Sequence, residues 1–267
     1  MFLDSLFKTR RHFHHDGSRH SHPHTHGPDE GMGITTQKSG TREIKVVRRV
    51  LDVNEKMAAQ NRKMFTDKGI FVLNLMSSPG SGKTTTLEKT LVRITPQIKS
   101  GVIVGDICTT NDADRLAVSG VPVVQINTDE FGGDCHLAAH VIEKAVGGLD
   151  LDDIDLLIVE NVGNLVCPAE FDIGEDARAV VLSVAEGEDK PAKYPLMFRE
   201  CEVALLNKVD LLPYLDYDKD KAIDYIHQVH PDMPIFEISA KTEEGFEPWL
   251  EWLIGKVRQK SQRTDDG

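Results

Sequence analysis

The chain has 267 residues, of which 40% are hydrophobic, and this is enough for one large α/β domain. Its formal net charge of -12 argues against nucleic acid as a partner, because affinity for phosphate backbones comes mainly from lysine and arginine. No apolar run approaches the ~20 residues of a membrane-spanning helix, and no secretory signal pattern is visible. We therefore expect a cytoplasmic protein whose four cysteines are thiols or metal ligands.

Residues 1–40 differ in composition from the rest of the chain. Seven of the eleven histidines fall there, interspersed with Ser, Gly, Pro, Asp and Arg. They are His12, His14, His15, His20, His22, His24 and His26. This composition predicts a disordered tail that binds nickel weakly. An expression tag is the alternative, but tags are usually uninterrupted histidine runs, so the broken pattern favours a native metal-storage or capture segment.

From residue 41 onward the apolar pattern predicts a folded domain that extends to residue 267. A helix covers about 41–65, and strands then alternate with helices. The predicted strands are 71–76, 101–105, 121–126, 155–159, 179–184, 203–206 and 235–238, and the clearest helices are 84–98 and 136–146. Continuous Val, Ile and Leu runs predict a mostly parallel sheet with helices on both faces. The polar residues from about Lys260 are expected to fray.

The segment SSPGSGKT joins the first predicted strand to a helix and fits the phosphate-binding pattern GxxxxGK[ST], except that Ser77 replaces the first glycine. Glycines allow backbone N–H groups to turn toward phosphates at a helix N-terminus. The predicted phosphate-binding residues are Gly80, Ser81, Gly82, Lys83, Thr84 and Thr85. An ordinary Gly/Ser turn is the alternative, but the strand–loop–helix context favours a P-loop NTPase.

Two later loops fit recognition of guanine. In the segment NKVD, the Asp210 carboxylate is placed to accept both N1–H and N2–H₂ of guanine, which adenine does not offer. The segment SAK follows the last predicted strand and resembles the second guanine-contacting loop of GTPases. The predicted base-binding residues are Asn207, Lys208, Asp210, Ser239, Ala240 and Lys241.

Two acids at strand ends are candidates to act with magnesium. Asp106 and Glu160 each end a predicted strand, and with Thr84 they form the predicted Mg²⁺ site. Gly163 offers a backbone N–H to the γ-phosphate. The predicted catalytic residues are Lys83, Thr84, Asp106 and Glu160. Helix capping or a surface charge is the alternative for either acid. Because no glutamine or arginine is obviously placed to assist hydrolysis, we expect slow intrinsic turnover, with some activation on assembly.

A second metal site is suggested by thiols and an imidazole. Cys135, His136 and Cys167 would give three of four tetrahedral ligands for zinc or nickel, and these donors suit both metals. The spacing is not that of a zinc finger, so ordinary half-buried cysteines are the alternative. Cys201 precedes a core strand and Cys108 lies in a polar loop, so we expect both to be structural, with a weak metal role left open for Cys108.

Taken together, the segments SSPGSGKTT, GDICTTNDADR, CHLAAH, DLLIVENVGNLVCPAEFDIGE, KYPLMF, LLNKVDLLPY and SAKTEEG resemble the HypB-type hydrogenase nickel-incorporation GTPases, from about Val46 to Val257. The resemblance implies a GTP-hydrolysing nickel metallochaperone that forms a homodimer with GTP. It also implies a HypA-type partner and the maturation machinery of the [NiFe]-hydrogenase large subunit. Cys135, His136 and Cys167 would bind zinc or nickel at the dimer interface. The chain departs from the family at Ala138, where an acid is common.

This gives a functional hypothesis with alternatives. Contacts of Glu160 and Gly163 with the γ-phosphate would set the position of Cys167, so metal affinity would differ between the GTP and GDP states. A related accessory GTPase for urease or a cobalamin enzyme shares the nucleotide motifs. A non-enzymatic nickel storage protein is a different class, which the intact Lys83, Thr84 and Asp210 disfavour.

Overall fold

The computed structural model describes residues 39–106, 111–117, 119–127 and 136–265, with side chains for 50–105, 113, 115–117, 119–127 and 136–263. The chain divides into two units, residues 1–43 and 44–267, and all the described strands belong to the second. The predicted His-rich tail, Cys108 and Cys135 lie outside the described residues. Among the described helices, none combines the length and the apolar character that crossing a membrane requires.

A single sheet of seven strands organises the second unit. The strands are β1 (Phe71–Ser77), β2 (Ser100–Asp106), β3 (Val123–Asn127), β4 (Leu156–Gly163), β5 (Ala177–Ser183), β6 (Val203–Asn207) and β7 (Ile235–Glu237). Their order is β3-β2-β4-β1-β5-β6-β7, and every neighbouring pair is parallel. This confirms the predicted α/β fold class.

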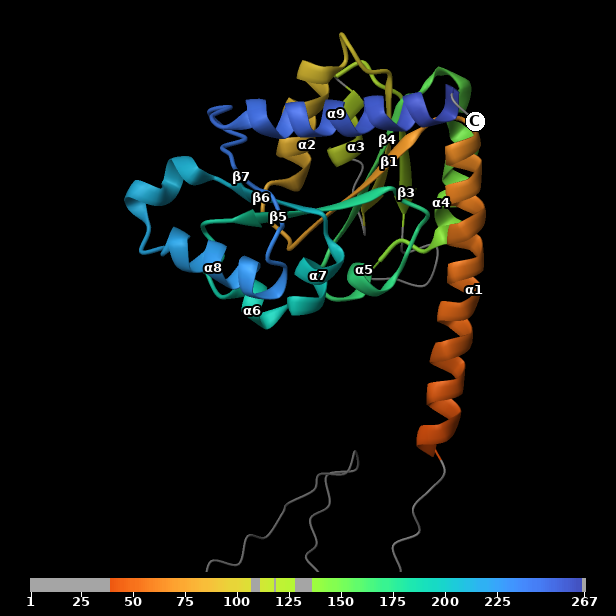
Figure 1. Ribbon diagram of the computed structural model, residues 1–267, viewed down its shortest axis with the longest axis horizontal. Coiled ribbons are helices and arrows are strands. Elements are labelled where there is room, and N and C mark those ends of the chain that lie inside the picture. The colour runs from red at the N-terminus through yellow and green to blue at the C-terminus, as the bar shows by residue number, and fades with distance from the viewer. Residues whose placement is uncertain (1–38, 107–110, 118, 128–135, 266–267) are drawn as a thin grey trace, which may run out of the picture. The chain divides into compact units, whose positions relative to one another are not determined.

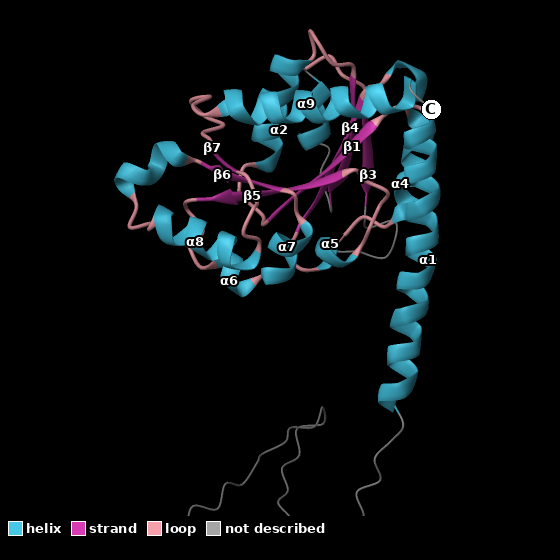
Figure 2. Cartoon of the chain, viewed as in Figure 1, coloured by secondary structure: helices cyan, strands magenta, loops and turns pink. Residues whose placement is uncertain are grey.

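Helices occupy both faces of this sheet (Figures 1 and 2). The α-helices are α1 (Ser39–Asp67), α2 (Lys83–Ile94), α3 (Asn111–Ala117), α4 (Ala139–Ala145), α5 (Cys167–Glu170), α6 (Lys190–Lys193), α7 (Pro195–Glu200), α8 (Lys219–Val229) and α9 (Phe246–Asp265). Short 3₁₀ helices lie between these elements: η2 (Val146–Gly148) and η3 (Leu151–Asp153) between α4 and β4, and η4 (Val209–Tyr214) between β6 and α8.

The core lies on the two sides of β1, whose seven residues are all buried. Leu73 and Leu75 pack with α2 and α9 on one face. Val72 packs with α4 and the end of α1 on the other face, and Met76 with α7 and α8. Because both faces are covered, the apolar residues of β1 point to both sides rather than alternating with exposed polar ones, as expected for a parallel sheet, and its two polar residues, Asn74 and Ser77, are buried as well.

Two predicted boundaries differ from the structure in ways that matter for the site. The strand predicted to end at Val159 continues as β4 to Gly163, so Glu160 lies within the sheet. The helix predicted to reach residue 98 ends at Ile94, because Pro96 lacks the backbone N–H that a longer helix would use.

The expected fraying from about Lys260 is wrong. Helix α9 continues to Asp265, and the Lys260 ammonium donates to Asp176 Oδ1 at 2.6 Å and to Thr66 Oγ1 at 2.9 Å. A largely buried ion pair therefore anchors a segment whose polar composition suggested a free end.

Candidate nucleotide and metal sites

The loop between β1 and α2 is shaped by two glycines with left-handed backbone conformations. Gly80 has a φ of 79° and Gly82 a φ of 92°. A Cβ atom on Gly82 would lie 2.5 Å from Asn207 Nδ2, so only glycine fits beneath that side chain. The loop thus reaches the first turn of α2 at Lys83 with its backbone turned as a phosphate cradle requires.

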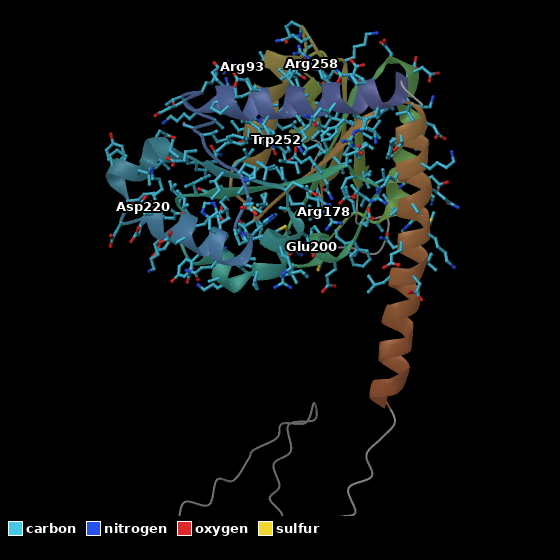
Figure 3. All side chains as sticks on the ribbon, viewed as in Figure 1. Arg93, Arg178, Glu200, Asp220, Trp252 and Arg258 are labelled. Atoms are coloured by element: carbon cyan, nitrogen blue, oxygen red, sulfur yellow. The ribbon has the colours of Figure 1, made fainter. Side chains whose placement is uncertain are left out.

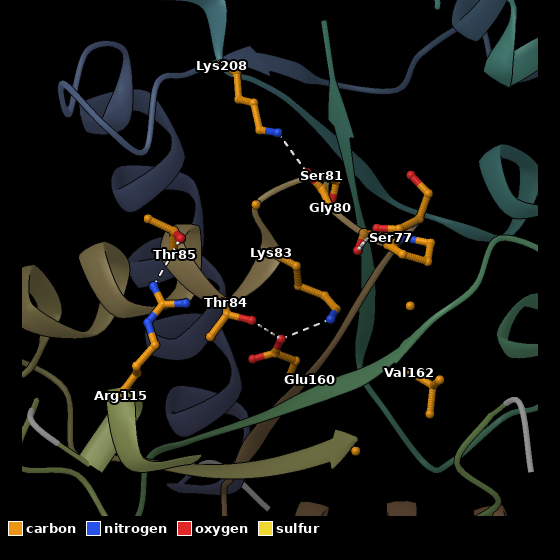
Figure 4. Close-up of a pocket in the computed structure, with 15 residues that line it drawn as sticks. Ser77, Gly80, Ser81, Lys83, Thr84, Thr85, Arg115, Glu160, Val162 and Lys208 are labelled. Atoms are coloured by element: carbon orange, nitrogen blue, oxygen red, sulfur yellow. Dashed lines mark hydrogen bonds and ion pairs between the residues drawn. The ribbon is translucent and has the colours of Figure 1, made fainter. Parts of the chain in front are cut away.

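Glu160 is the centre of a buried polar cluster at this loop (Figure 4). Its Oε1 accepts a hydrogen bond from Lys83 Nζ at 2.9 Å and another from Thr84 Oγ1 at 2.6 Å. The residue is 1% exposed, and its Oε2 is buried with no hydrogen-bond partner among the described atoms. A buried carboxylate oxygen without a donor is costly, so this position is suited to a cation or a water held by one.

Sequence reasoning thus placed Lys83, Thr84 and Glu160 correctly near one another. Asp106, the other predicted magnesium ligand, ends β2 beside β4, but its side chain lies outside the described part of the chain. Gly163 ends β4 against the phosphate loop, where a Cβ atom would lie 3.3 Å from Pro79.

The NKVD and SAK loops meet through Asn207. Its Nδ2 donates to the Ser81 carbonyl at 2.9 Å, and its Oδ1 accepts from the Ala240 N–H at 3.0 Å. Lys208 adopts a φ of 66°, unusual for a residue with a side chain, and its Nζ donates to the Gly80 carbonyl at 2.7 Å. The side chains of Asn207 and Lys208 therefore connect the phosphate loop to the loop that is predicted to bind the guanine base.

Asp210 and Ser239 are also brought together. Ser239 Oγ donates to Asp210 Oδ1 at 2.6 Å and accepts from the Thr242 N–H at 3.1 Å. Lys241 is exposed. All six predicted base-binding residues are thus gathered on two adjacent loops at one edge of the sheet, after β6 and β7.

A cavity of about 520 Å³ lies over the phosphate loop. Its walls include Gly80, Lys83, Thr84, Glu160, Gly163 and Lys208. This volume lies within the ~300–1,000 Å³ typical of small-molecule sites.

Arg115 is a wall residue that sequence reasoning missed. It comes from α3, and its Nη2 donates to Thr85 Oγ1 at 3.1 Å and to Glu88 Oε2 at 2.9 Å. The signal lay in the segment DADR, but only the fold shows that α3 packs beside α2. A guanidinium on the wall of a phosphate cavity adds positive potential there.

The predicted zinc or nickel site is only partly within the described residues. The His136 ring stacks on Phe171, with ring centroids 3.7 Å apart, and Phe171 directly follows α5. Cys167 is half-buried at the start of that same short helix. The structure thus brings His136 next to the helix that carries Cys167. Within the described residues no three metal-binding side chains form a cluster, and Cys135 is not among them.

Cys201 is structural, as predicted. It is buried, its Sγ lies 3.7 Å from Met197 Sδ, and burial raises its pKa well above the ordinary value for a thiol. A thiol held neutral in an apolar environment is a poor metal ligand.

A glycine-rich loop that presents a lysine and a threonine to a buried acid is built to hold nucleotide phosphates, and an all-parallel sheet carries it. The fold and site therefore define a P-loop nucleotide-binding protein. Within that class, the chain belongs to the HypB hydrogenase maturation factors of the CobW/HypB/UreG family.

Comparison with known proteins supports this assignment. The family model described as "CobW/HypB/UreG, nucleotide-binding domain" matches residues 71–237. Hydrogenase maturation factor HypB of Escherichia coli (strain K12) is 49% identical over 234 residues, which cover 88% of this chain and 77% of that protein. A relative from Helicobacter pylori (strain J99), named hydrogenase/urease maturation factor HypB, is 39% identical over 84% of this chain and 92% of its own.

Two solved structures share the fold. The crystal structure of HypB from Helicobacter pylori in complex with nickel gives a TM-score of 0.73 at 39% identity, covering 78% of this chain and 96% of that one. HypB from Archaeoglobus fulgidus gives a TM-score of 0.72 at 37% identity, covering 77% of this chain and 99% of the other.

Proposed function

We propose that the protein hydrolyses GTP and uses the nucleotide state to control nickel binding during maturation of a [NiFe]-hydrogenase. One observation carries the proposal. Glu160, which contacts Lys83 and Thr84 of the phosphate loop, lies on the same segment as Cys167, seven residues further along the chain. A shift of the end of β4 on γ-phosphate loss would therefore move a metal-binding thiol.

Each part of the nucleotide site has an assigned task in this proposal. Lys83 and the N-terminus of α2 bind the phosphates, and Asp210 recognises the guanine N–H groups. Thr84, Glu160 and Asp106 would hold Mg²⁺, which supplies positive charge to the phosphates. The unpartnered Oε2 of Glu160 fits that ion. Release of Lys83 from Glu160 frees its ammonium to contact phosphate.

Cys135, His136 and Cys167 are the proposed ligands of nickel or zinc, and they would lie at the interface of a GTP-dependent homodimer. The name of the nickel-complexed relative supports nickel as cargo, and the donor set suits zinc equally. The seven tail histidines would store further nickel weakly. A HypA-type metallochaperone is the proposed partner, and the cytoplasm the proposed location.

Urease is the second candidate client, because the Helicobacter pylori relative is named for both enzymes. Storage without catalysis is disfavoured by the contacts of Glu160 with Lys83 and Thr84, which a protein that only buffered nickel would have no need to keep.

Phosphate release by the purified full chain, supplied with GTP or ATP and Mg²⁺, tests the enzymatic part. We expect slow hydrolysis of GTP in preference to ATP. Glu160→Gln should lower the rate about tenfold or more, because the variant loses the charge that orients Lys83 and balances the metal. Nickel binding without GTP binding or hydrolysis would instead identify a storage protein.

A further inference from the structure

Asn161 follows Glu160 in β4 and faces the opposite side of the sheet. Glu160 contacts the phosphate loop, whereas the Asn161 side chain bonds to β1 and to the segment before α4. Leu75 pairs with Glu160 and Ser77 with Gly163, so β4 carries one residue more than β1 at this point. Such a bulge redirects a side chain out of the regular ladder, and bulges are frequent beside functional sites.

The Asn161 side chain accepts hydrogen bonds from two backbone N–H groups at this bulge. It is fully buried, and its Oδ1 accepts from the Val162 N–H at 2.9 Å and from the Leu137 N–H at 3.2 Å. Leu137 directly follows His136. One amide oxygen therefore ties the strand end beside the phosphates to the residue next to a proposed metal ligand.

The other end of the same amide leads toward Cys167. Asn161 Nδ2 donates to Asn74 Oδ1 at 3.2 Å, and Asn74 Nδ2 donates to Glu175 Oε1 at 3.3 Å. Glu175 is held by Arg178 Nε at 2.5 Å, and Arg178 Nη1 donates at 3.1 Å to the carbonyl of Ala169 in α5.

This chain of bonds is closed to solvent over most of its length. Asn74 and Asn161 are fully buried, and Glu175 is 7% exposed. Arg178 lies in β5 near Glu200 (Figure 3), and its Nη1 is 3.9 Å from the Glu200 carboxylate. Buried polar networks of this kind are rigid when every member has a partner, so movement at one end displaces the other.

We propose that Asn161 is the positioning residue that couples the nucleotide site to nickel: it sets the placement of His136 through the Leu137 N–H, and of Cys167 through Asn74, Glu175, Arg178 and the Ala169 carbonyl. This inference rests on the proposed nickel role of Cys135, His136 and Cys167. It adds which side chain carries the effect of the γ-phosphate across the sheet.

Asn54 provides a matched control. This buried asparagine on α1 accepts from the Ala139 N–H at 2.9 Å and donates to the Asp172 carbonyl at 2.7 Å. It therefore bonds directly to the start of α4, close to Leu137, and to the segment that follows α5, so it lies near both ends of the network that runs through Asn161. The hydrogen bonds described for Asn54 do not involve β4. Asn54 should therefore help to hold the metal-binding segments in place, whichever nucleotide is bound.

The test measures Ni²⁺ affinity of the full chain, with the seven tail histidines replaced by glutamine, in the GDP state and with a non-hydrolysable GTP analogue and Mg²⁺. Coupled sites typically differ by about 5- to 150-fold between states. Asn161→Ala should bring that ratio to within about twofold of unity. Asn54→Ala should lower nickel affinity in both states and leave the ratio unchanged.

Other outcomes separate the two hypotheses. A ratio of unity in the unmutated background overturns the proposed coupling of nickel to GTP, and this inference with it. If the unmutated background shows a difference in nickel affinity between the two states and Asn161→Ala keeps that difference, the role of Asn161 alone is overturned. The same conclusion follows if Asn54→Ala removes the difference as fully as Asn161→Ala does.

A second measurement needs no variant, and it decides the matter if Asn161→Ala does not fold. Amide hydrogen exchange at Leu137 in the unmutated chain should differ between the two nucleotide states, because its acceptor lies on Asn161. Identical protection of that amide in both states would overturn the inference.

Discussion

Asn207 joins the two halves of the nucleotide site through one side chain, since its amide bonds to both the Ser81 carbonyl and the Ala240 N–H. Replacing it would loosen the phosphate loop as well as the base loop. Asp210, by contrast, touches only Ser239 among the contacts described for its carboxylate. Its charge is therefore free to serve the base rather than the architecture.

Asp210→Asn should change which base is bound. We expect GTP affinity to fall about 10²-fold or more, because an amide cannot accept two N–H groups from guanine. Xanthine carries an oxygen where guanine has N2–H₂, so affinity for XTP should rise. Titration with both nucleotides, using Asp216→Asn as an exposed control, measures the change. Unaltered preference for GTP would show that another group reads the base.

At the scale of elements, local patterns predicted the parts of the site that lie close together in the sequence. The phosphate loop was predictable because its residues are consecutive between a strand and a helix. Neither Arg115 on the cavity wall nor the bonds of Asn161 could be predicted in this way. Apart from Val162, their partners named above are 24 to 87 residues away along the chain, and only packing brings them together.

Helix α9 shows the same limit. Its polar C-terminal part suggested fraying, because composition alone does not reveal that Lys260 meets Asp176. Trp249 at the other end is buried against α2, where its Nε1 donates to Thr90 Oγ1 at 3.0 Å. Contacts at both ends therefore fix the helix against the sheet.

Lys260→Ala should lower the free energy of unfolding by about 1–3 kcal/mol, since it removes a charged hydrogen bond from a mostly buried carboxylate. The side chains of Lys260 and Asp176 are only 12% and 19% exposed. Urea unfolding of the variant beside Gln262→Ala, an exposed position on the same helix, provides the comparison. Equal stability of the two variants would mean that α9 frays after all.

The ion pair between Arg62 of α1 and Asp172 should make the free energy of unfolding depend on pH in the acidic range. Burial opposes the charge on Asp172, but the Arg62 guanidinium and the Gly174 N–H outweigh it and lower the pKa of the carboxyl. Because the pKa of Asp172 is lower in the folded than in the unfolded chain, its ionisation adds to the free energy of unfolding, and this addition is complete above the unfolded pKa of about 3.9. This addition is lost as the pH falls through the pKa of Asp172 in the folded chain.

Asp172→Asn should therefore cost at most about 1 kcal/mol near neutral pH, because both side chains remain a third or more exposed. The difference from the unmutated chain should shrink as the pH falls below about 4. Thermal unfolding across this range measures it, with Asp52→Asn as a control for loss of a negative charge on α1. A difference that stays constant with pH would exclude the ion pair as its source.

On the scale of the whole molecule, both proposed sites are organised by the carboxyl ends of parallel strands. The phosphate loop follows β1, Glu160 lies near the end of β4, and Asn207 ends β6. Ligands bind at this edge in open α/β sheets. Because β4 continues toward the helix that carries Cys167, one strand serves the nucleotide on one side and the proposed metal segments on the other.

The central claim is that bound GTP changes the affinity for nickel, and bound nickel the affinity for GTP, through β4. Isothermal titration of Ni²⁺ into the full chain with its tail histidines replaced, in the GDP state and with a non-hydrolysable GTP analogue, tests it most directly. We predict affinities that differ at least about fivefold between the two states, and a site that Cys167→Ala removes in both. Equal nickel affinity in the two states, or a site unchanged by Cys167→Ala, would contradict the account.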